Sequence, residues 1–165
     1  MRLGMTVKTE KSPFLNLHHV GWVVRDLGKA IEHFEYLGIG PWRRFTLPSA
    51  GSGHDLTKWE HYDKSGVGFK YEIADAQMGP IKVELFECIS GDSIPKKFLE
   101  AKGEGIWHMS YVVSPEDFDK AVAEMTAKGF KVVGSSTSAD GTRMVYFDTD
   151  KIGGVVFQLH DSDKF

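Results

Sequence analysis

The sequence predicts an α+β fold made of two βαβββ modules that arose by internal duplication. The first observation is a repeated motif, because LHHVGWVV at residues 17–24 matches IWHMSYVV at residues 106–113. A second pair matches later in each copy, GPIKVEL at 79–85 and GGVVFQL at 153–159. Two long copies indicate an old duplication of one supersecondary unit, since solenoids carry shorter and more numerous repeats.

Composition places the chain among ordinary globular proteins. Its 165 residues suit one compact domain, and 41% hydrophobic with 26% charged residues is typical of a folded core. A net charge of −3 without a basic block argues against nucleic acid and anionic membranes as partners, and no apolar run could span a bilayer. The N-terminus lacks the apolar core of a signal peptide, and the single Cys88 cannot form an internal disulfide. We therefore expect a cytoplasmic protein.

The first module is expected at residues 15–92, after a tail at 1–14. Residues 17–24 are rich in β-branched and aromatic side chains and predict a strand. Asp26 can cap the next helix, which ends before Gly38. A loop is expected at 49–53, strands at 58–62 and 67–74 with a turn at 64–66, and a strand at 81–88. The helix is predicted by apolar residues at spacings of three and four: Leu27, Ala30, Ile31, Phe34 and Leu37.

The second module repeats this scheme at residues 106–161, after a linker at 93–105 with a helix at 94–102. A strand is expected at 107–113. A helix is expected from about Pro115 to Lys128, since proline suits the first helical turn. Strands follow at 131–135, 142–147 and 154–160.

Four polar residues occupy equivalent places in the two copies, and they predict a metal site. His19 aligns with His108, and Glu84 aligns with Gln158. Glu84 and Gln158 each stand between apolar neighbours, so they face away from the apolar side of a strand. Polar groups that converge in a curved sheet can be satisfied by a divalent ion. Two imidazoles, a carboxylate and an amide suit Zn, Ni, Co, Mn or Fe, with positions left for substrate.

The other histidines are weaker candidates. A single buried histidine is more often a structural core residue, and only the repeat raises the odds for the aligned pair. His18 is the rival of His19, but adjacent strand residues face opposite ways, so only one can be a ligand, and the alignment selects His19. His160 lies two residues after Gln158, on the same strand face, and is a second candidate. His33 is expected on an exposed helix face, whereas His54 and His61 could approach a substrate.

These motifs, together with GEGIWHM at 103–109, resemble the vicinal oxygen chelate superfamily over about residues 15–161. That superfamily includes glyoxalase I, methylmalonyl-CoA epimerase, extradiol dioxygenases and bleomycin-binding proteins. FLEAKGEGI at 98–106 is most similar to the epimerase and glyoxalase branch. The resemblance implies a U-shaped mixed sheet around a metal cleft, and a homodimer.

The resemblance also implies a chemistry. A small substrate would chelate the ion through a carbonyl or vicinal oxygens, and a lyase or isomerase would enolise it, with Glu84 as the catalytic base. Many members carry Glu where this chain has Gln158, so an Fe(II) dioxygenase would need Glu84 as its carboxylate. A metal-free drug-binding protein is the third alternative.

Epimerisation would need a second proton-transfer group. The epimerase family carries a Glu before a Gly-Val turn, and Lys64 stands in that place here. The candidates for the second group are Asp63, His160 and Glu72, and the sequence does not choose among them. Arg43 and Arg44 could meet an anionic substrate.

Overall fold

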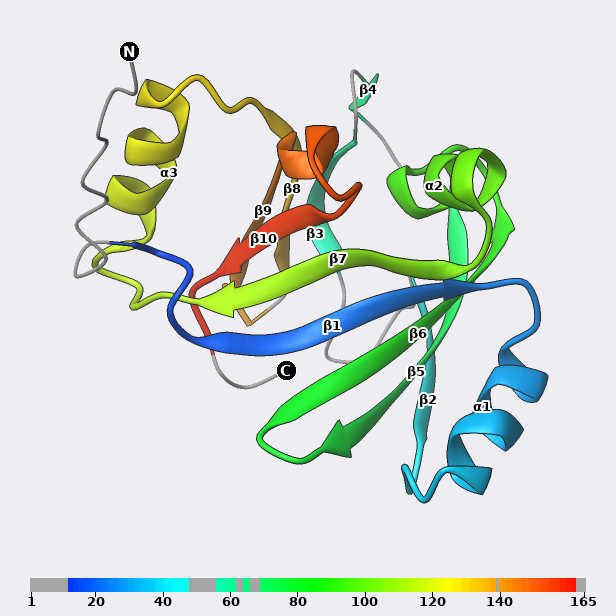
Figure 1. Ribbon diagram of the computed structural model, residues 1–165. Coiled ribbons are helices and arrows are strands. Elements are labelled where there is room, and N and C mark those ends of the chain that lie inside the picture. Colours follow the sequence, from blue (N-terminus) through cyan, green and yellow to red (C-terminus); the bar gives the residue numbers. More distant parts are fainter. Residues whose placement is uncertain (1–11, 48–55, 62–63, 66–68, 139, 163–165) are drawn as a thin grey trace, which may run out of the picture.

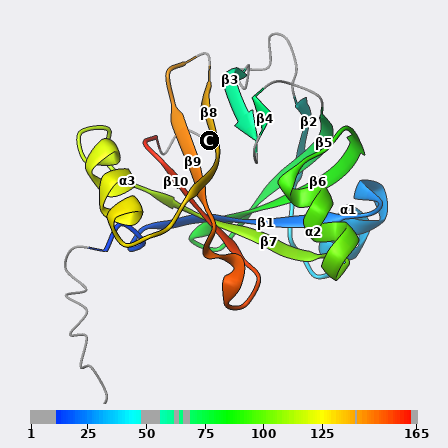
Figure 2. The same cartoon turned by 90° about the horizontal axis from the view of Figure 1, so that it is seen from above.

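The computed structural model describes residues 12–47, 56–61, 64–65, 69–138 and 140–162, with the backbone alone at 56–61 and 64–65. Within these residues, the strands form one mixed sheet in the order β2-β5-β6-β1-β7-β10-β9-β8-β3-β4. Seen from above, β1 and β7 form the middle of the sheet, and the outer strands rise on either side of it (Figure 2). The predicted α+β architecture with a curved sheet is confirmed.

The first half begins as predicted, with a strand followed by a helix. Its sheet comprises β1 (Leu17–Val24), β2 (Arg43–Leu47), β5 (Lys70–Met78) and β6 (Ile81–Ser90), and helix α1 (Leu27–Tyr36) lies against it (Figure 1). The Asp26 side chain caps α1 by accepting a hydrogen bond from the Lys29 backbone N–H. Gly79 turns the chain from β5 to β6 with a φ of 61°, a left-handed conformation that glycine adopts without strain.

The second half repeats the unit after helix α2 (Ile94–Lys102). It contains β7 (Gly105–Val112), α3 (Phe118–Ala127), β8 (Val132–Ser138), β9 (Arg143–Phe147), the short 3-10 helix η2 (Thr149–Lys151) and β10 (Val156–His160). Helix α3 begins later than predicted. The Ser114 hydroxyl accepts from the Asp117 N–H, and the Pro115 carbonyl accepts from Arg143, so this segment forms a turn.

The predicted hairpin between residues 58–62 and 67–74 is wrong. Strand β3 (Leu56–His61) pairs with β8 of the second half and with the short β4 (Lys64–Ser65). On the side away from β6, strand β5 pairs with β2. Strand β2 was not predicted, because its charged start conceals the alternation of a strand. The loop expected at 49–53 lies outside the described residues. The module boundaries at 15–92 and 106–161 stay a prediction.

The two copies meet along β1 and β7, which are antiparallel neighbours. Strand β6 runs parallel to β1, and β10 runs parallel to β7. Gly21 pairs with Glu84 on one side and His108 on the other, while Ser110 pairs with Gln158 and His19. The register therefore places Glu84 and Gln158 at equivalent positions, as the repeat predicted.

The sheet is buried on both faces, which fixes the direction of the polar residues. Val83 and Leu85 pack in the cluster under α1, whereas Phe86 packs on the other face, with Trp107 and Tyr146. Glu84 alternates with Val83 and Leu85, so it faces the same side as Phe86. A third cluster lies under α3 and contains Phe118, Met125, Phe147 and Leu159.

No helix among the described residues is long and apolar enough to cross a membrane.

Candidate metal-binding site

Three of the four predicted ligands converge on one point. His19 Nε2 lies 3.0 Å from His108 Nε2 and 3.5 Å from Glu84 Oε2. One ligand atom from each of the three residues lies within 4.8 Å of the others. The side chains come from β1, β7 and β6, so both halves of the duplicated chain contribute.

The spacing of these atoms fits one divalent ion. Two ligands about 2.1 Å from an ion lie roughly 3.0 Å apart at a right angle and about 3.4 Å apart in a tetrahedron. The distances from His19 Nε2 to His108 and Glu84 match these values closely. The donor chemistry agrees, since two imidazoles and a carboxylate bind Zn, Ni, Co, Mn or Fe(II). The residues present therefore fit the ion that the sequence predicted.

Burial sets the charge of these groups in the absence of an ion. His108 is fully buried, and burial, followed by nearby His160, lowers its pKa to about 3. Burial also lowers the pKa of His19 well below its usual range, with His108 adding to the effect. Both imidazoles are thus neutral, as metal ligands must be. Burial, then Asp75, raises the pKa of Glu84 to about 8, so the metal-free site holds a protonated carboxyl that a bound cation would ionise.

Gly21 makes room for the His108 ring. It lies beside His108 in the β1–β7 ladder, and a Cβ atom at this position would overlap Cε1 and Nδ1 of the imidazole. The ring is enclosed on other sides by Phe86, Trp107 and Tyr146, with centroids 5.7, 4.1 and 5.8 Å away. Packing therefore fixes His108 with its Nε2 toward His19.

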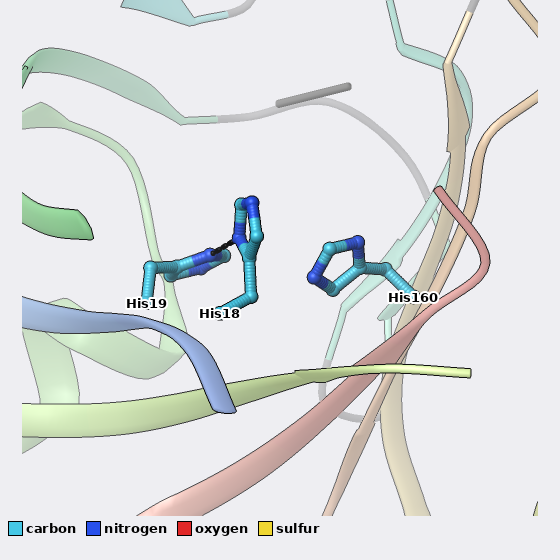
Figure 3. Close-up of side chains that lie close together, drawn as sticks. All are labelled: His18, His19 and His160. Atoms are coloured by element: carbon cyan, nitrogen blue, oxygen red, sulfur yellow. Dashed lines mark hydrogen bonds between the residues drawn. The ribbon is translucent and has the colours of Figure 1, made fainter. Parts of the chain in front are cut away.

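The expectation that His18 and His19 point to opposite faces of the strand is wrong, whereas the choice of His19 over His18 as the ligand stays a prediction. His18 Nδ1 lies 2.8 Å from His19 Nδ1 (Figure 3), whereas His108 lies next to the other ring nitrogen of His19, Nε2. The cause is a β-bulge: Leu17 pairs with Tyr111 and His19 with Ser110, so His18 is an extra residue in β1. Bulges re-aim side chains, and nothing in the sequence motif signals this one.

Gln158 is buried on β10, paired with Ser110 on one side and Tyr146 on the other. Its Oε1 is buried without a hydrogen-bond partner among the described atoms. Burial and the nearby Glu84 raise the pKa of Tyr146, and a hydrogen bond with Gln158 opposes this shift. Gln158 thus lies next to Tyr146, which also contacts the His108 ring, and its part as a fourth ligand stays a prediction.

An ion pair reaches the site from the outer strands. Arg43 on β2 binds both carboxylate oxygens of Asp75, one of them from Nε at 3.1 Å, and Asp75 pairs with Glu84 across β5 and β6. Asp75 is buried while the Arg43 side chain is 55% exposed. The sequence predicts Arg43 only as a possible anion contact. It does not indicate Asp75, because the role of this residue depends on the register of two strands.

The other residues that the sequence suggested for the site lie away from it or outside the described residues. Glu72 accepts a hydrogen bond from Thr46 and lies opposite Glu87, whose carboxylate accepts from the N–H of Leu27 at the start of α1. This is the helix-covered face, so Glu72 is wrong as a second proton-transfer group. His33 is exposed on α1, as predicted. His54 and Asp63 lie outside the described residues, as does the side chain of His61.

Comparison with known proteins agrees with this fold. Residues 18–147 match the model of the Glyoxalase/Bleomycin resistance protein/Dioxygenase superfamily. The chain therefore belongs to that superfamily, which confirms the predicted vicinal oxygen chelate relationship. It is similar to a curated 2-epi-5-epi-valiolone epimerase from Actinomyces sp, with 31% identity over 141 residues, covering 81% of this chain and 73% of the relative.

Solved structures share the fold. Methylmalonyl-CoA epimerase from Mycobacterium tuberculosis is 22% identical with a TM-score of 0.62, covering 91% of this chain and 89% of that chain. The hypothetical protein BH1468 from Bacillus halodurans is 20% identical with a TM-score of 0.61, covering 88% and 92%.

Proposed function

We propose that this protein is a divalent-metal-dependent epimerase that inverts a carbon next to a carbonyl group. The observation that carries the proposal is the convergence of His19, Glu84 and His108 at distances that suit one ion. When bound, the ion would supply a Lewis acid that stabilises the enolate oxygen. Similarity to an epimerase that acts on 2-epi-5-epi-valiolone supports the same reaction class.

The residues of the chain have distinct parts in this proposal. His19 and His108 are neutral donors, and packing around His108 holds its ring still. Glu84 is the base that takes the proton from the substrate carbon, because its carboxylate is the one acidic group in this cluster. In the metal-free protein, burial and then Asp75 raise the pKa of Glu84 to about 8, while Lys82 and Arg43 oppose the rise.

The fold narrows the choice of a second proton-transfer group for the opposite face of the substrate. Glu72 faces the wrong side of the sheet, and of the sequence candidates His160 and Asp63 remain. The substrate is expected to carry a carbonyl beside the inverted carbon and an oxygen in reach of the ion. The compound 2-epi-5-epi-valiolone is the first to test, and acyl-CoA thioesters are the second.

The test is proton exchange in deuterated water. Purified protein loaded with Zn, Co, Ni or Mn is mixed with each substrate, and NMR follows loss of the α-proton signal and appearance of the epimer. We expect Glu84→Gln to abolish exchange, and His108→Ala to abolish both exchange and metal binding at the site of His19 and Glu84, while His33→Ala behaves as wild type. Full exchange by Glu84→Gln would refute the assignment of the base. Wild-type protein that retains none of the four ions would refute the metal-dependent reaction.

A second candidate function, that of an Fe(II) oxygenase, is favoured by one observation. Two histidines and one carboxylate at a single point also form the donor set of non-haem Fe(II) oxygenases. Anaerobic loading with Fe(II), followed by oxygen consumption in the presence of a catechol, tests this alternative. Oxygen uptake that depends on both the catechol and His108 would replace the epimerase proposal.

A further inference from the structure

A second cluster of imidazoles adjoins the site. His18, His19 and His160 each offer one ring nitrogen, and these atoms all lie within 4.8 Å of one another. The rings of His18 and His160 are 4.8 Å apart, and His160 is completely buried. Figure 3 shows the three side chains converging from β1 and β10. Three histidines from two strands therefore surround one point.

The two clusters share His19 but use opposite sides of its ring. The Nε2 atom faces His108 and Glu84, whereas the Nδ1 atom faces His18 at 2.8 Å. Either nitrogen of an imidazole can bind a metal ion. The clusters therefore do not compete for the same lone pair, and one ring can serve both.

The bulge in β1 creates this arrangement. In a regular strand, His18 would point to the face opposite His19. The extra residue between the Leu17–Tyr111 and His19–Ser110 pairs brings both imidazoles to the same side. On β10, His160 follows Gln158 by two residues and so shares its face. The resulting geometry is local to three residues and independent of Glu84 and His108.

We propose that His18, His19 and His160 hold a second metal ion, with His19 as a bridging ligand between the two sites. Three nitrogen donors without a carboxylate suit Zn²⁺, Cu²⁺ or Ni²⁺ rather than Mg²⁺ or Ca²⁺. Occupation of both sites requires the His19 ring to lose its remaining N–H proton, which passes to solvent. Three protein ligands leave a fourth position for water or a substrate oxygen. His160 is then a ligand, which removes it as the second proton-transfer group.

The test is metal stoichiometry, measured without substrate so that its outcome does not depend on the proposed reaction. Metal-free protein is saturated separately with Zn²⁺ and Cu²⁺, passed through a desalting column and analysed for bound ions. We expect two ions per chain in wild type, and one ion in each of His160→Ala and His108→Ala. The variant His33→Ala, which removes an exposed histidine on α1, should keep two.

A spectroscopic measurement accompanies the count. Two Cu²⁺ ions joined through one imidazole ring should show spin coupling in their electron paramagnetic resonance spectrum, and His160→Ala should show an isolated Cu²⁺ signal. One ion per chain in saturated wild type, or two ions in His160→Ala, would overturn the proposal. So would two ions in wild-type protein without spin coupling. Circular dichroism checks that each variant is folded, and His160→Gln replaces His160→Ala if the alanine variant is not.

Discussion

The variant Gly21→Ala tests whether the fold, and not only the ligands, builds the metal site. The added Cβ would overlap the His108 ring, which is fully buried and has aromatic rings on its other sides. Overpacking of this kind costs about 1–3 kcal/mol. For a chain of this size, each kcal/mol lowers Tm by about 2–4 °C. We therefore expect a thermal midpoint roughly 2–12 °C below wild type, in the metal-free protein.

Metal affinity should fall as well, because the displaced ring is itself a ligand. Loss of a group that merely supports a ligand costs about 10–100-fold in affinity, so we expect a loss of at least that size. The assays are thermal melts by circular dichroism and Zn²⁺ titration by calorimetry. Gly105→Ala is the matched control on β7, since its Cβ would lie 3.7 Å from the Phe98 ring, an ordinary contact. Wild-type Tm and Zn²⁺ affinity in Gly21→Ala would refute the reasoning.

Three further predictions concern charge and packing. In the metal-free protein the pKa of Glu84 is about 8 against 4.5 when unfolded, so the folded state keeps a proton that the unfolded state loses. The free energy of unfolding should then fall by about 1 kcal/mol as the pH rises from roughly 7 to 8, above the usual histidine range. The variant Glu84→Gln should lack this decrease in urea titrations. Arg43→Ala leaves the buried Asp75 carboxylate without this partner and should lower the free energy of unfolding by about 1–3 kcal/mol, toward the lower end because Arg43 is exposed. No change in the same assay would show that the ion pair does not stabilise the fold. Leu159→Ala, in the core under α3, should lower the free energy of unfolding by about 2–5 kcal/mol. Ile152→Ala, at a residue that is 91% exposed, should change it by no more than about 0.5 kcal/mol, and equal effects of the two variants would contradict the described packing.

The sequence predicted those features that depend on a local pattern or on the repeat. Strand β1, helix α1 and the cap at Asp26 follow from propensity and periodicity, and the structure confirms them. Because the duplication preserves the register of the central strands, the alignment of the two motifs was enough to predict that His19 and His108 lie close together. The superfamily followed from the same motifs.

The features that the sequence did not predict depend on pairing between strands that lie far apart in the sequence. A bulge depends on how two strands fit together, so the motif of β1 does not reveal that His18 joins His19. The same holds for Asp75, which gains its importance from neighbours on β2 and β6. Sequence order is the default guide to strand pairing, so it predicts that residues 58–62 pair with 67–74 in their own half, whereas β3 pairs with β8. The homodimer and the cytoplasmic location stay predictions.

The pairing of β3 with β8 has a consequence for the independence of the two copies. The chain leaves the first half after β2, adds β3 and β4 to the far edge of the second half, and then returns to form β5 and β6. When β3 emerges during synthesis, the strand that it must join lies more than 70 residues later in the chain. A cut between the two copies would leave one fragment with a strand that lacks its partner β8 and the other with a bare sheet edge. We therefore expect the two copies to fold together.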